Sequence, residues 1–289
     1  MKLALQRCCT TPVFLKQYET STDAVLKKLG IELVDVKEFG CCGYPLRNHS
    51  LKAYVICSAR NLSLAEKQKF NIMTFCNCCY GSLKHVDELL KKDDVLRKDI
   101  NDTLSKEGLK YDGSIEIRHL LEVFYENIGI DKIKKEIVRT FKGLKIAVHY
   151  GCHVLRPRQL VQFDDPGTAA IFDQLVEITG AETVPWRTQL ECCGSPMWGI
   201  DDELSMDLTE KKIADARLSG AHYFCIACSY CQVQFDRVQK ILISKRNGKH
   251  HLPSVLYTQL LGLALGIDAG VLGIDQNEVD ISGILKFLS

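Results

Sequence analysis

Two short stretches of the chain, GCCGYP at Gly40–Pro45 and ECCGSP at Glu191–Pro196, carry almost the same cysteine motif. The chain has 14 cysteines among 289 residues, and it is long enough to build its own core without disulfides. Clustered cysteines in a reducing compartment bind metal or perform redox chemistry more often than they form structural bridges. The doubled Cys-Cys-Gly-x-Pro motif therefore indicates two similar metal or redox sites.

A further cysteine precedes each motif, at the end of a short apolar run. The run that ends at Cys9 aligns with the run that ends at Cys152, and this register leaves Cys8 opposite Gly151. Short apolar runs of this kind predict buried strands that deliver a ligand at their carboxyl ends. We therefore expect Cys9 to be a ligand and Cys8 to be a spare cysteine.

A Cys-x-x-Cys pair follows each motif. Apolar residues stand at +4, +7, +10 and +11 after both Cys79 and Cys231, which is the stripe of an amphipathic helix. This match aligns the pair Cys76 and Cys79 with the pair Cys228 and Cys231. A competing register, in which Cys225 and Cys228 form the second pair, stays open.

Each half thus offers one strand-end cysteine, one adjacent pair and one Cys-x-x-Cys. The ten predicted ligands are Cys9, Cys41, Cys42, Cys76, Cys79, Cys152, Cys192, Cys193, Cys228 and Cys231. Three cysteines outside the shared register, Cys8, Cys78 and Cys225, are expected not to be essential ligands.

Five thiolates per half are more than a structural zinc ion takes, because such a site closes with four ligands. Adjacent thiolates can bind different irons of one cluster, so an iron–sulfur cluster fits the pattern better. A zinc site remains an alternative, and a thioredoxin-like role leaves the adjacent pairs unexplained. Two similar one-electron centres suit a two-electron reaction such as the reduction of a disulfide.

The elements around the cysteines alternate between strands and helices. Amphipathic stretches at residues 50–70 and 203–218 predict a helix after each Cys-Cys motif. This order predicts an α/β fold of two pseudo-symmetric α/β repeats with mainly parallel sheets, each carrying a CCG cluster site. We place the first repeat at residues 1–140 and the second at residues 141–289.

The composition favours a soluble cytoplasmic protein. The net charge of +1 gives no electrostatic support for nucleic-acid binding, and no signal peptide opens the chain. The most apolar stretch, residues 255–267, is short for a membrane span and suits a buried helix. The polar stretch that contains His250 and His251 indicates a solvated loop.

The complete pattern of ten cysteines resembles the cysteine-rich CCG domain. It reads Cys9-x31-Cys41-Cys42-x33-Cys76-x2-Cys79 and then Cys152-x39-Cys192-Cys193-x34-Cys228-x2-Cys231. Two copies with nothing else attached resemble the B subunit of heterodisulfide reductase, over essentially the whole chain. The x39 spacer is at or slightly past the long end of the family's usual range, which implies a longer loop beside the second site.

The resemblance implies that each half binds one non-cubane [4Fe-4S] cluster through its five cysteines. It implies a catalytic subunit that reduces a disulfide of the coenzyme M–coenzyme B type, as in methanogenesis. Its implied partners are the ferredoxin-like iron–sulfur C subunit and the flavin-containing A subunit of such a complex. The same domain is similar to parts of thiol:fumarate reductase, so the alternative is a non-catalytic electron-transfer subunit of a flavin-dependent dehydrogenase or fumarate-reductase-type complex.

Four further residues are candidates for substrate chemistry. His153 follows Cys152, where the first half has Thr10, and an imidazole there can protonate a leaving thiolate near neutral pH. A structural histidine is the other interpretation. Three arginines of the second half can hold the sulfonate or phosphate of an anionic thiol, or else lie solvated on the surface. They are Arg156, Arg158 and Arg187.

Overall fold

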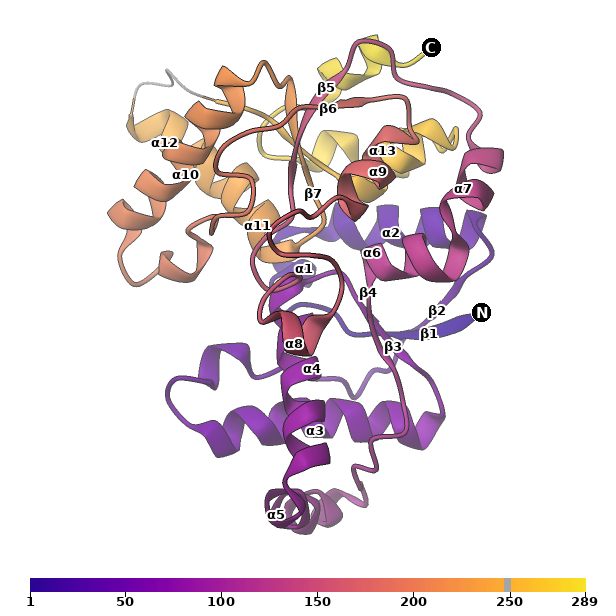
Figure 1. Cartoon of the computed structure of the whole chain (residues 1–289), viewed down its shortest axis with the longest axis vertical. Helices are drawn as coiled ribbons and strands as arrows, with labels where there is room; N and C mark the ends of the chain where they lie inside the picture. The colour runs from indigo at the N-terminus through magenta and orange to yellow at the C-terminus, as the bar shows by residue number, and fades with distance from the viewer. Residues whose placement is uncertain (247–250) are drawn as a thin grey trace.

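Each half of the chain folds around a sheet of four short parallel strands, in a computed structural model that describes residues 1–246 and 251–289 (Figure 1). The first sheet has the strand order β2-β1-β3-β4 and the second has the order β6-β5-β7-β8. The strands are β1 (Lys2–Leu5), β2 (Glu32–Val34), β3 (Ile72–Thr74), β4 (Ile117–His119), β5 (Lys145–His149), β6 (Glu182–Thr183), β7 (Tyr223–Ile226) and β8 (Ser254–Leu256). The predicted α/β fold with two parallel repeats is confirmed.

Helices connect the strands and cover the sheets. Those of the first half are α1 (Thr11–Phe14), α2 (Lys16–Lys28), α3 (Leu51–Gln68), α4 (Asn77–Lys92), α5 (Asp94–Leu104), α6 (Leu120–Glu122) and α7 (Ile130–Glu136). Those of the second half are α8 (Arg158–Val161), α9 (Ile171–Glu177), α10 (Asp202–Leu218), α11 (Ser229–Val233), α12 (Gln239–Lys245) and α13 (Tyr257–Ala264).

Short 3₁₀ and π-helical turns complete the backbone. The 3₁₀ turns are η1 (Tyr44–Leu46), η2 (Ser105–Glu107), η4 (Ser195–Met197), η6 (Ile274–Gln276) and η7 (Ser282–Phe287). The π-helical turns are η3 (Val123–Ile128) and η5 (Gln234–Val238). Turns η1 and η4 directly follow the two Cys-Cys-Gly motifs, so the motif and its turn are repeated together.

The inner strands β1, β3, β5 and β7 are buried except at the first residue of β1 and of β5. All residues of β3 and β7 are buried, and a cysteine follows the end of each strand by two residues, at Cys76 and Cys228. Because the carboxyl ends of parallel strands share one edge of a sheet, the cysteines of each half gather at that edge.

The two halves pack closely on each other. Helix α2 of the first half lies against α13 of the second half (Figure 1), and Ser21 Oγ lies 2.7 Å from Thr258 Oγ1 between them. All residues of α13 are buried, as expected for a buried helix at residues 255–267, but the start of that stretch belongs to β8 instead. The helix prediction was therefore wrong for Val255 and Leu256 and for residues 265–267, which follow the end of α13.

No helix among residues 1–246 and 251–289 is long and apolar enough to cross a membrane. His250, in the stretch expected to be a loop, lies outside the described residues, and His251 is exposed.

Candidate metal centres

The first cysteine group lies at the carboxyl edge of the first sheet. The thiols of Cys8, Cys76 and Cys79 are buried, and they lie within 4.8 Å of one another. Cys42 is also buried, and its thiol is within hydrogen-bond reach of the thiol of Cys79. Three of the predicted ligands, Cys42, Cys76 and Cys79, are therefore brought together, and Cys8 joins them.

Cys9 lies at the more exposed end of the same group. Its thiol is within hydrogen-bond reach of Cys41 and Cys8, and its Sγ lies 4.0 Å from Tyr230 Oη of the second half. The structure thus places both Cys8 and Cys9 beside the predicted ligands. The choice of Cys9 over Cys8 as the ligand stays a prediction.

The second cysteine group repeats this arrangement. A ring nitrogen of His149 and the thiols of Cys193 and Cys231 lie within 4.8 Å of one another, and all three residues are buried. The thiol of Cys192 reaches both Cys152 and Cys193, so it connects the strand-end cysteine to the buried group. The sequence analysis did not predict that His149 belongs to this group.

Each Cys-Cys pair is turned toward its site by the glycine that follows it. Gly43 and Gly194 have φ angles of +83° and +92°, a left-handed conformation that side chains disfavour. Their backbone N–H groups donate to the sulfur two residues earlier, at 3.4 Å for Cys41 and 3.5 Å for Cys192. The glycine therefore lets the backbone support the first thiol of each pair.

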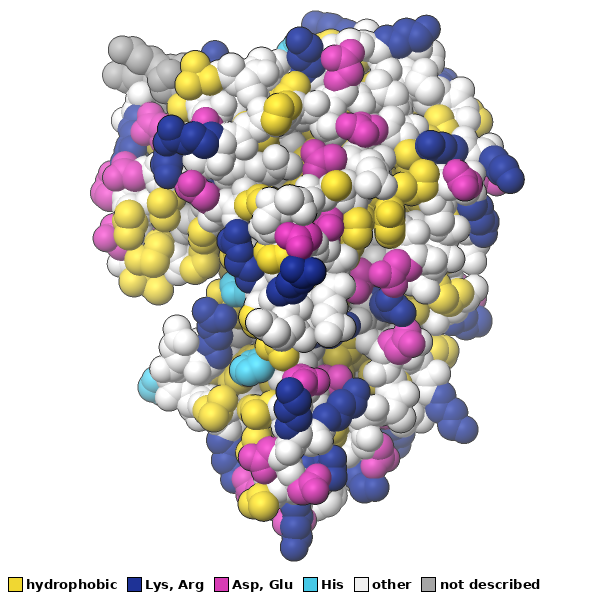
Figure 2. All heavy atoms as spheres, viewed as in Figure 1, with side chains coloured by type: hydrophobic (Ala, Val, Ile, Leu, Met, Phe, Trp, Pro, Cys, Tyr) yellow, Lys and Arg dark blue, Asp and Glu magenta, His cyan; other side chains and the backbone are white. Residues whose placement is uncertain are grey.

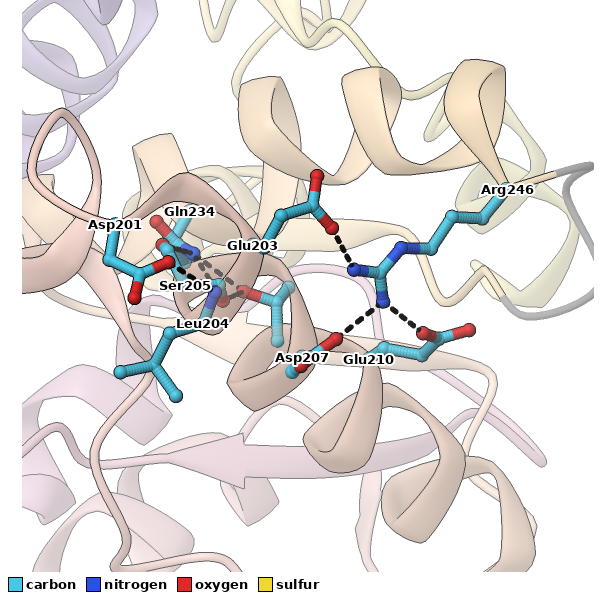
Figure 3. Close-up of polar contacts among 9 residues, drawn as sticks. Asp201, Glu203, Leu204, Ser205, Asp207, Glu210, Gln234 and Arg246 are labelled. Atoms are coloured by element: carbon cyan, nitrogen blue, oxygen red, sulfur yellow. Dashed lines mark hydrogen bonds and ion pairs between the residues drawn. The ribbon is translucent and has the colours of Figure 1, made fainter.

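The following helix holds the second cysteine of each pair. On α3, the Ser58 hydroxyl donates to the Cys42 carbonyl at 2.6 Å, and on α10 the Thr209 hydroxyl faces the Cys193 carbonyl at 3.3 Å. In the second half, the amide of Gln234 donates to the Thr209 hydroxyl and also to the Ser205 hydroxyl at 2.9 Å (Figure 3). The side chains on α3 and α10 therefore fix the backbone of both turns.

Two sets of polar contacts hold helix α10 in place, one at its first turn and one with the end of α12. The Asp201 carboxylate caps its first turn and accepts from the Leu204 N–H at 3.0 Å. Arg246, at the end of α12, binds three carboxylates of α10 at 2.7–2.8 Å (Figure 3). These hydrogen bonds raise the pKa of the guanidinium, so the arginine stays charged and fastens α12 to α10. The three carboxylates are those of Glu203, Asp207 and Glu210.

The two cysteine groups meet at the contact between the halves. The thiols of Cys76 and Cys228, at the starts of α4 and α11, lie close enough for each to shift the pKa of the other. The Asn77 amide then crosses to the Tyr150 carbonyl of the second half at 2.7 Å. Ser229, at the equivalent position, contacts a threonine hydroxyl of the first half. The halves are therefore joined by equivalent positions next to equivalent cysteines.

A pocket of about 340 Å³ opens beside this junction, lined by residues of both halves. Its walls include Tyr44, Arg47 and His85 from the first half and His153 and Arg156 from the second. Figure 2 shows the surface hollowed between two lobes, with histidine and basic side chains along the hollow. The pocket therefore presents histidine and arginine side chains beside Cys78, and its His153 also contacts Cys152.

His153 connects this pocket to the thiols. Its Nε2 lies 3.4 Å from Arg47 Nη1, and its Nδ1 lies 3.5 Å from Cys152 Sγ and 3.6 Å from Cys78 Sγ. A guanidinium can only donate, so Nε2 accepts and Nδ1 carries the proton that faces the two sulfurs. Burial, and then the charge of Arg47, lowers the pKa of His153, which keeps the ring neutral near pH 7.

The three arginines expected to bind substrate lie in different places. Arg156 lines the pocket, and its guanidinium donates to the Leu190 carbonyl at 3.1 Å. Arg158 is exposed and pairs with Asp165 at 2.8 Å, away from the pocket. Arg187 is exposed and does not line the pocket.

Two of the cysteines predicted not to be ligands lie in different environments, one in the core and one at the contact between the halves. Cys225 lies on β7 within the hydrophobic core. Cys78 instead belongs to α4 of the first half but faces Cys152 and His153 of the second half.

Sequence reasoning missed three polar residues beside the sites. Arg47 follows the first Cys-Cys-Gly turn and lies 4.5 Å above the ring of Tyr44, at the pocket wall. Its closeness to the motif was the available signal. Lys212 is 1% exposed on α10, and burial lowers its pKa to about 8. His149 has both ring nitrogens buried, and neither has a hydrogen-bond partner in the part of the chain that the structure describes.

Iron–sulfur clusters fit this donor set. Each half presents more soft sulfur donors than a four-coordinate zinc ion needs, and the second half adds an unpartnered buried imidazole. The fold and these paired groups define an α/β protein with two cysteine-rich candidate metal sites.

Comparison with known proteins places this architecture in a family. The family model of the CCG cysteine-rich domain matches twice, at residues 3–84 and 146–236. The chain therefore belongs to the CCG cysteine-rich domain family, with two copies of the domain.

Its relatives include components of redox complexes. One is the B subunit of the ferredoxin/F(420)H(2)-dependent CoB-CoM heterodisulfide reductase of Methanosarcina acetivorans, 35% identical over 96% of this chain and 94% of the relative. Another is the 8-methylmenaquinol:fumarate reductase membrane anchor subunit of Wolinella succinogenes, 33% identical over 90% of each chain. The crystal structure of a hypothetical protein from Helicobacter pylori shares the fold, with a TM-score of 0.77 and 16% identity. The match covers 98% of this chain and 52% of that one.

Proposed function

We propose that this chain is the disulfide-reducing iron–sulfur subunit of a heterodisulfide-reductase-type complex. The observation that carries the proposal is the junction between the halves, where Cys76 lies beside Cys228 and Cys78 Sγ lies 3.6 Å from His153 Nδ1, next to a pocket that both halves line. A disulfide bound at this junction would lie between the two candidate metal centres. Relatives over nearly the full length are named as B subunits of CoB-CoM heterodisulfide reductases, which supports a substrate of the coenzyme M–coenzyme B type.

The proposed cofactors are two non-cubane [4Fe-4S] clusters, each held by the five cysteines of one half. We keep Cys9 in the first set because its thiol lies against Cys41 and because it aligns with Cys152. Cys8 stands opposite Gly151, so the second half offers no equivalent of its thiol. When bound, the two clusters supply one electron each to the disulfide, and iron stabilises the sulfur atoms as they gain charge.

The residues of the pocket stabilise charge and position the substrate. The Nδ1–H of His153 faces sulfur atoms, so it can donate a hydrogen bond to a leaving thiolate as that sulfur gains charge. Arg47 orients that imidazole from the other side and, with Arg156, attracts an anionic end of the substrate. Arg158 and Arg187 are left out of this role because neither lines the pocket.

The electrons have to come from other proteins of the complex. The chain contains no C-x2-C-x2-C-x3-C ferredoxin motif of its own. The partners we propose are a ferredoxin-like iron–sulfur C subunit and a flavin-containing A subunit, since the relatives belong to such reductases by name.

The test is anaerobic reduction of a disulfide by the purified chain. A reduced viologen dye serves as the electron donor, and coenzyme M–coenzyme B disulfide serves as the acceptor. We expect dye oxidation that depends on the disulfide, with two dye molecules oxidised per disulfide and two free thiols formed. Replacing His153 by Gln should lower kcat at least tenfold while iron content stays constant. Iron-loaded protein that gives no disulfide-dependent oxidation contradicts the proposal.

The second candidate is a non-catalytic electron-transfer subunit. The relative in Wolinella succinogenes, named as part of a fumarate reductase, favours this function. Such a protein passes electrons between partners and binds no thiol at its clusters. It predicts that thiols leave the electron paramagnetic resonance (EPR) spectrum unchanged, and that the His153→Gln variant transfers electrons as fast as the unaltered chain.

A further inference from the structure

The two halves carry different side chains at two matched positions beside their candidate clusters. When β1 is aligned with β5, Gln6 of the first half corresponds to His149 of the second. On the helices α3 and α10, Asn61 and Lys212 each follow the second cysteine of their pair by 19 residues. The hydroxyls of Ser58 and Thr209 both face that cysteine's carbonyl, 16 residues away along the chain, which supports this register.

The first half uses neutral amides at both positions. The Gln6 amide donates to the Gly40 carbonyl at 2.9 Å, and the Asn61 amide donates to the same carbonyl at 3.0 Å. Asn61 also accepts from the Gly40 N–H at 2.9 Å. These two side chains therefore hold the backbone before Cys41 and add no charge to the site.

The second half places a buried cation where the first has Asn61. The Lys212 ammonium donates to the Glu191 carbonyl at 3.2 Å and to the Thr188 carbonyl, and it lies 4.5 Å from the centre of the Trp186 ring. No carboxylate among the described residues lies within 4.0 Å of it, because the Glu191 side chain pairs with Lys211 instead. A buried charge without a partner is costly, so a negative group nearby stabilises it.

The cysteines of the second group become negative near Lys212 when they bind metal as thiolates. The charges that raise the pKa of Lys212 against the effect of burial come first from Cys193 and Cys231. The same two thiols lie within 4.8 Å of the His149 imidazole. Among the described residues neither ring nitrogen of His149 has a well-formed hydrogen bond, although the Gln189 backbone lies near the ring, so a sulfur of the bound group can accept from its N–H.

We propose that Lys212 and His149 make the second cluster easier to reduce than the first. A fixed positive charge and an N–H···S hydrogen bond both stabilise the extra electron of a reduced iron–sulfur cluster. The first half has only neutral amides at these positions, both engaged with backbone. This inference rests on the proposed clusters, but it does not depend on which disulfide they reduce.

The difference in reduction potential between the two clusters determines where an electron resides. An electron that enters the pair settles on the second cluster, in the half that also carries His153. The hydrogen-bond donor His153 and the more stable electron therefore lie on the same side of the junction.

The test is an EPR-monitored redox titration of the anaerobic, iron-loaded chain. The signal that disappears in Cys192→Ser is assigned to the second cluster. We expect this cluster to have the higher midpoint potential, and we expect Lys212→Asn to shift that potential to a more negative value. The first cluster should stay unchanged. Lys211→Asn is the matched control: it removes the same charge from the same helix at an exposed, ion-paired position, so both potentials should stay constant.

A second variant keeps the test decisive if Lys212→Asn loses its iron. His149→Gln installs the residue of the first half without changing a charge, and it should also shift the second potential downward. Labelling histidine with ¹⁵N should give a weak nitrogen coupling to the cluster that His149→Gln removes. Equal potentials in the two clusters, or potentials that neither variant moves, overturn the inference. A nitrogen coupling as strong as an Fe–N bond also overturns the hydrogen-bonding role of His149.

These outcomes separate this inference from the proposed function. Failure of the disulfide assay leaves the potentials measurable, and unchanged potentials leave disulfide reduction intact.

Discussion

Replacing Gly194 by Ala tests how the Cys-Cys-Gly turn positions its thiols. The residue has a φ of +92°, which costs an alanine about 1–2 kcal/mol relative to glycine. A Cβ there would also lie 2.8 Å from the Ser205 carbonyl oxygen and 3.0 Å from Leu208 Cβ, both on α10. The backbone of that helix has to move, and overpacking of this kind costs about 1–3 kcal/mol more.

Gly199 provides the matched control, since its φ of +86° is similar and a Cβ would meet nothing within 4 Å. Gly199→Ala should therefore lower the free energy of unfolding by about 1–2 kcal/mol, from backbone strain alone. Gly194→Ala should lower it by about 2–5 kcal/mol, the strain and the clash together. The measurement is anaerobic urea unfolding followed by far-UV circular dichroism, with iron determined on the same samples.

The site should respond together with the fold. Gly194→Ala displaces the N–H that supports the Cys192 sulfur, so iron in the second half should fall while Gly199→Ala retains it. Equal loss of stability in the two variants would refute the reasoning, because it would mean that the close approach to α10 has no energetic effect. Full iron content in Gly194→Ala would show that the turn does not position the thiols.

The other predictions concern the metal content, the ligands and the pH dependence. Fully loaded protein should contain about eight irons per chain, as two clusters of four require, and a reproducible value near half of that would mean that one half lacks its site. Cys9→Ser should lose the first cluster, whereas Cys8→Ser, Cys78→Ser and Cys225→Ser should retain both; iron analysis that shows the reverse for Cys8 and Cys9 would exchange their roles. Burial lowers the pKa of His119 from 6.5 to about 4. The free energy of unfolding therefore includes about 3 kcal/mol above pH 6.5, where the ring is neutral in both states, and loses it as the pH falls toward 4. His119→Asn should therefore flatten the pH dependence of the urea midpoint between pH 6.5 and 4, and an unchanged slope would contradict the assignment.

The sequence pattern predicted the α/β repeats because the signals are local and occur twice. The helices expected at residues 50–70 and 203–218 are present as α3 (Leu51–Gln68) and α10 (Asp202–Leu218), each starting at a capping residue, Ser50 or Asp201. The fourth strand of each sheet escaped detection, since β4 and β8 have three residues each and show no periodicity. The boundary at residue 140 stays a prediction.

The polar residues of the site were harder to predict, because their roles come from contacts between distant segments. Lys211 and Lys212 are identical neighbours in sequence, yet one is exposed and paired with Glu191 while the other is buried behind the cysteines. The two lysines differ because successive residues of a helix lie on different faces of it. Arg47 likewise gains its role from His153, more than a hundred residues away in the other half.

The junction itself shows how far the symmetry of the repeats extends. The residue two positions after the first cysteine of each Cys-x-x-Cys pair crosses to the opposite half, so Tyr230 lies 4.0 Å from the thiol of Cys9, and Cys78 lies 3.6 Å from His153. At one crossing a phenol whose pKa is raised by burial faces the Cys9 sulfur, and at the other the Nδ1–H of an imidazole faces the Cys78 sulfur. A pure electron relay needs no such hydrogen-bond donors beside the sulfurs where its centres meet. A reaction that converts a disulfide into two thiols needs two protons, and an unsymmetrical substrate needs two different ends of the pocket. The departure from symmetry at this junction is what favours the disulfide reductase over the relay.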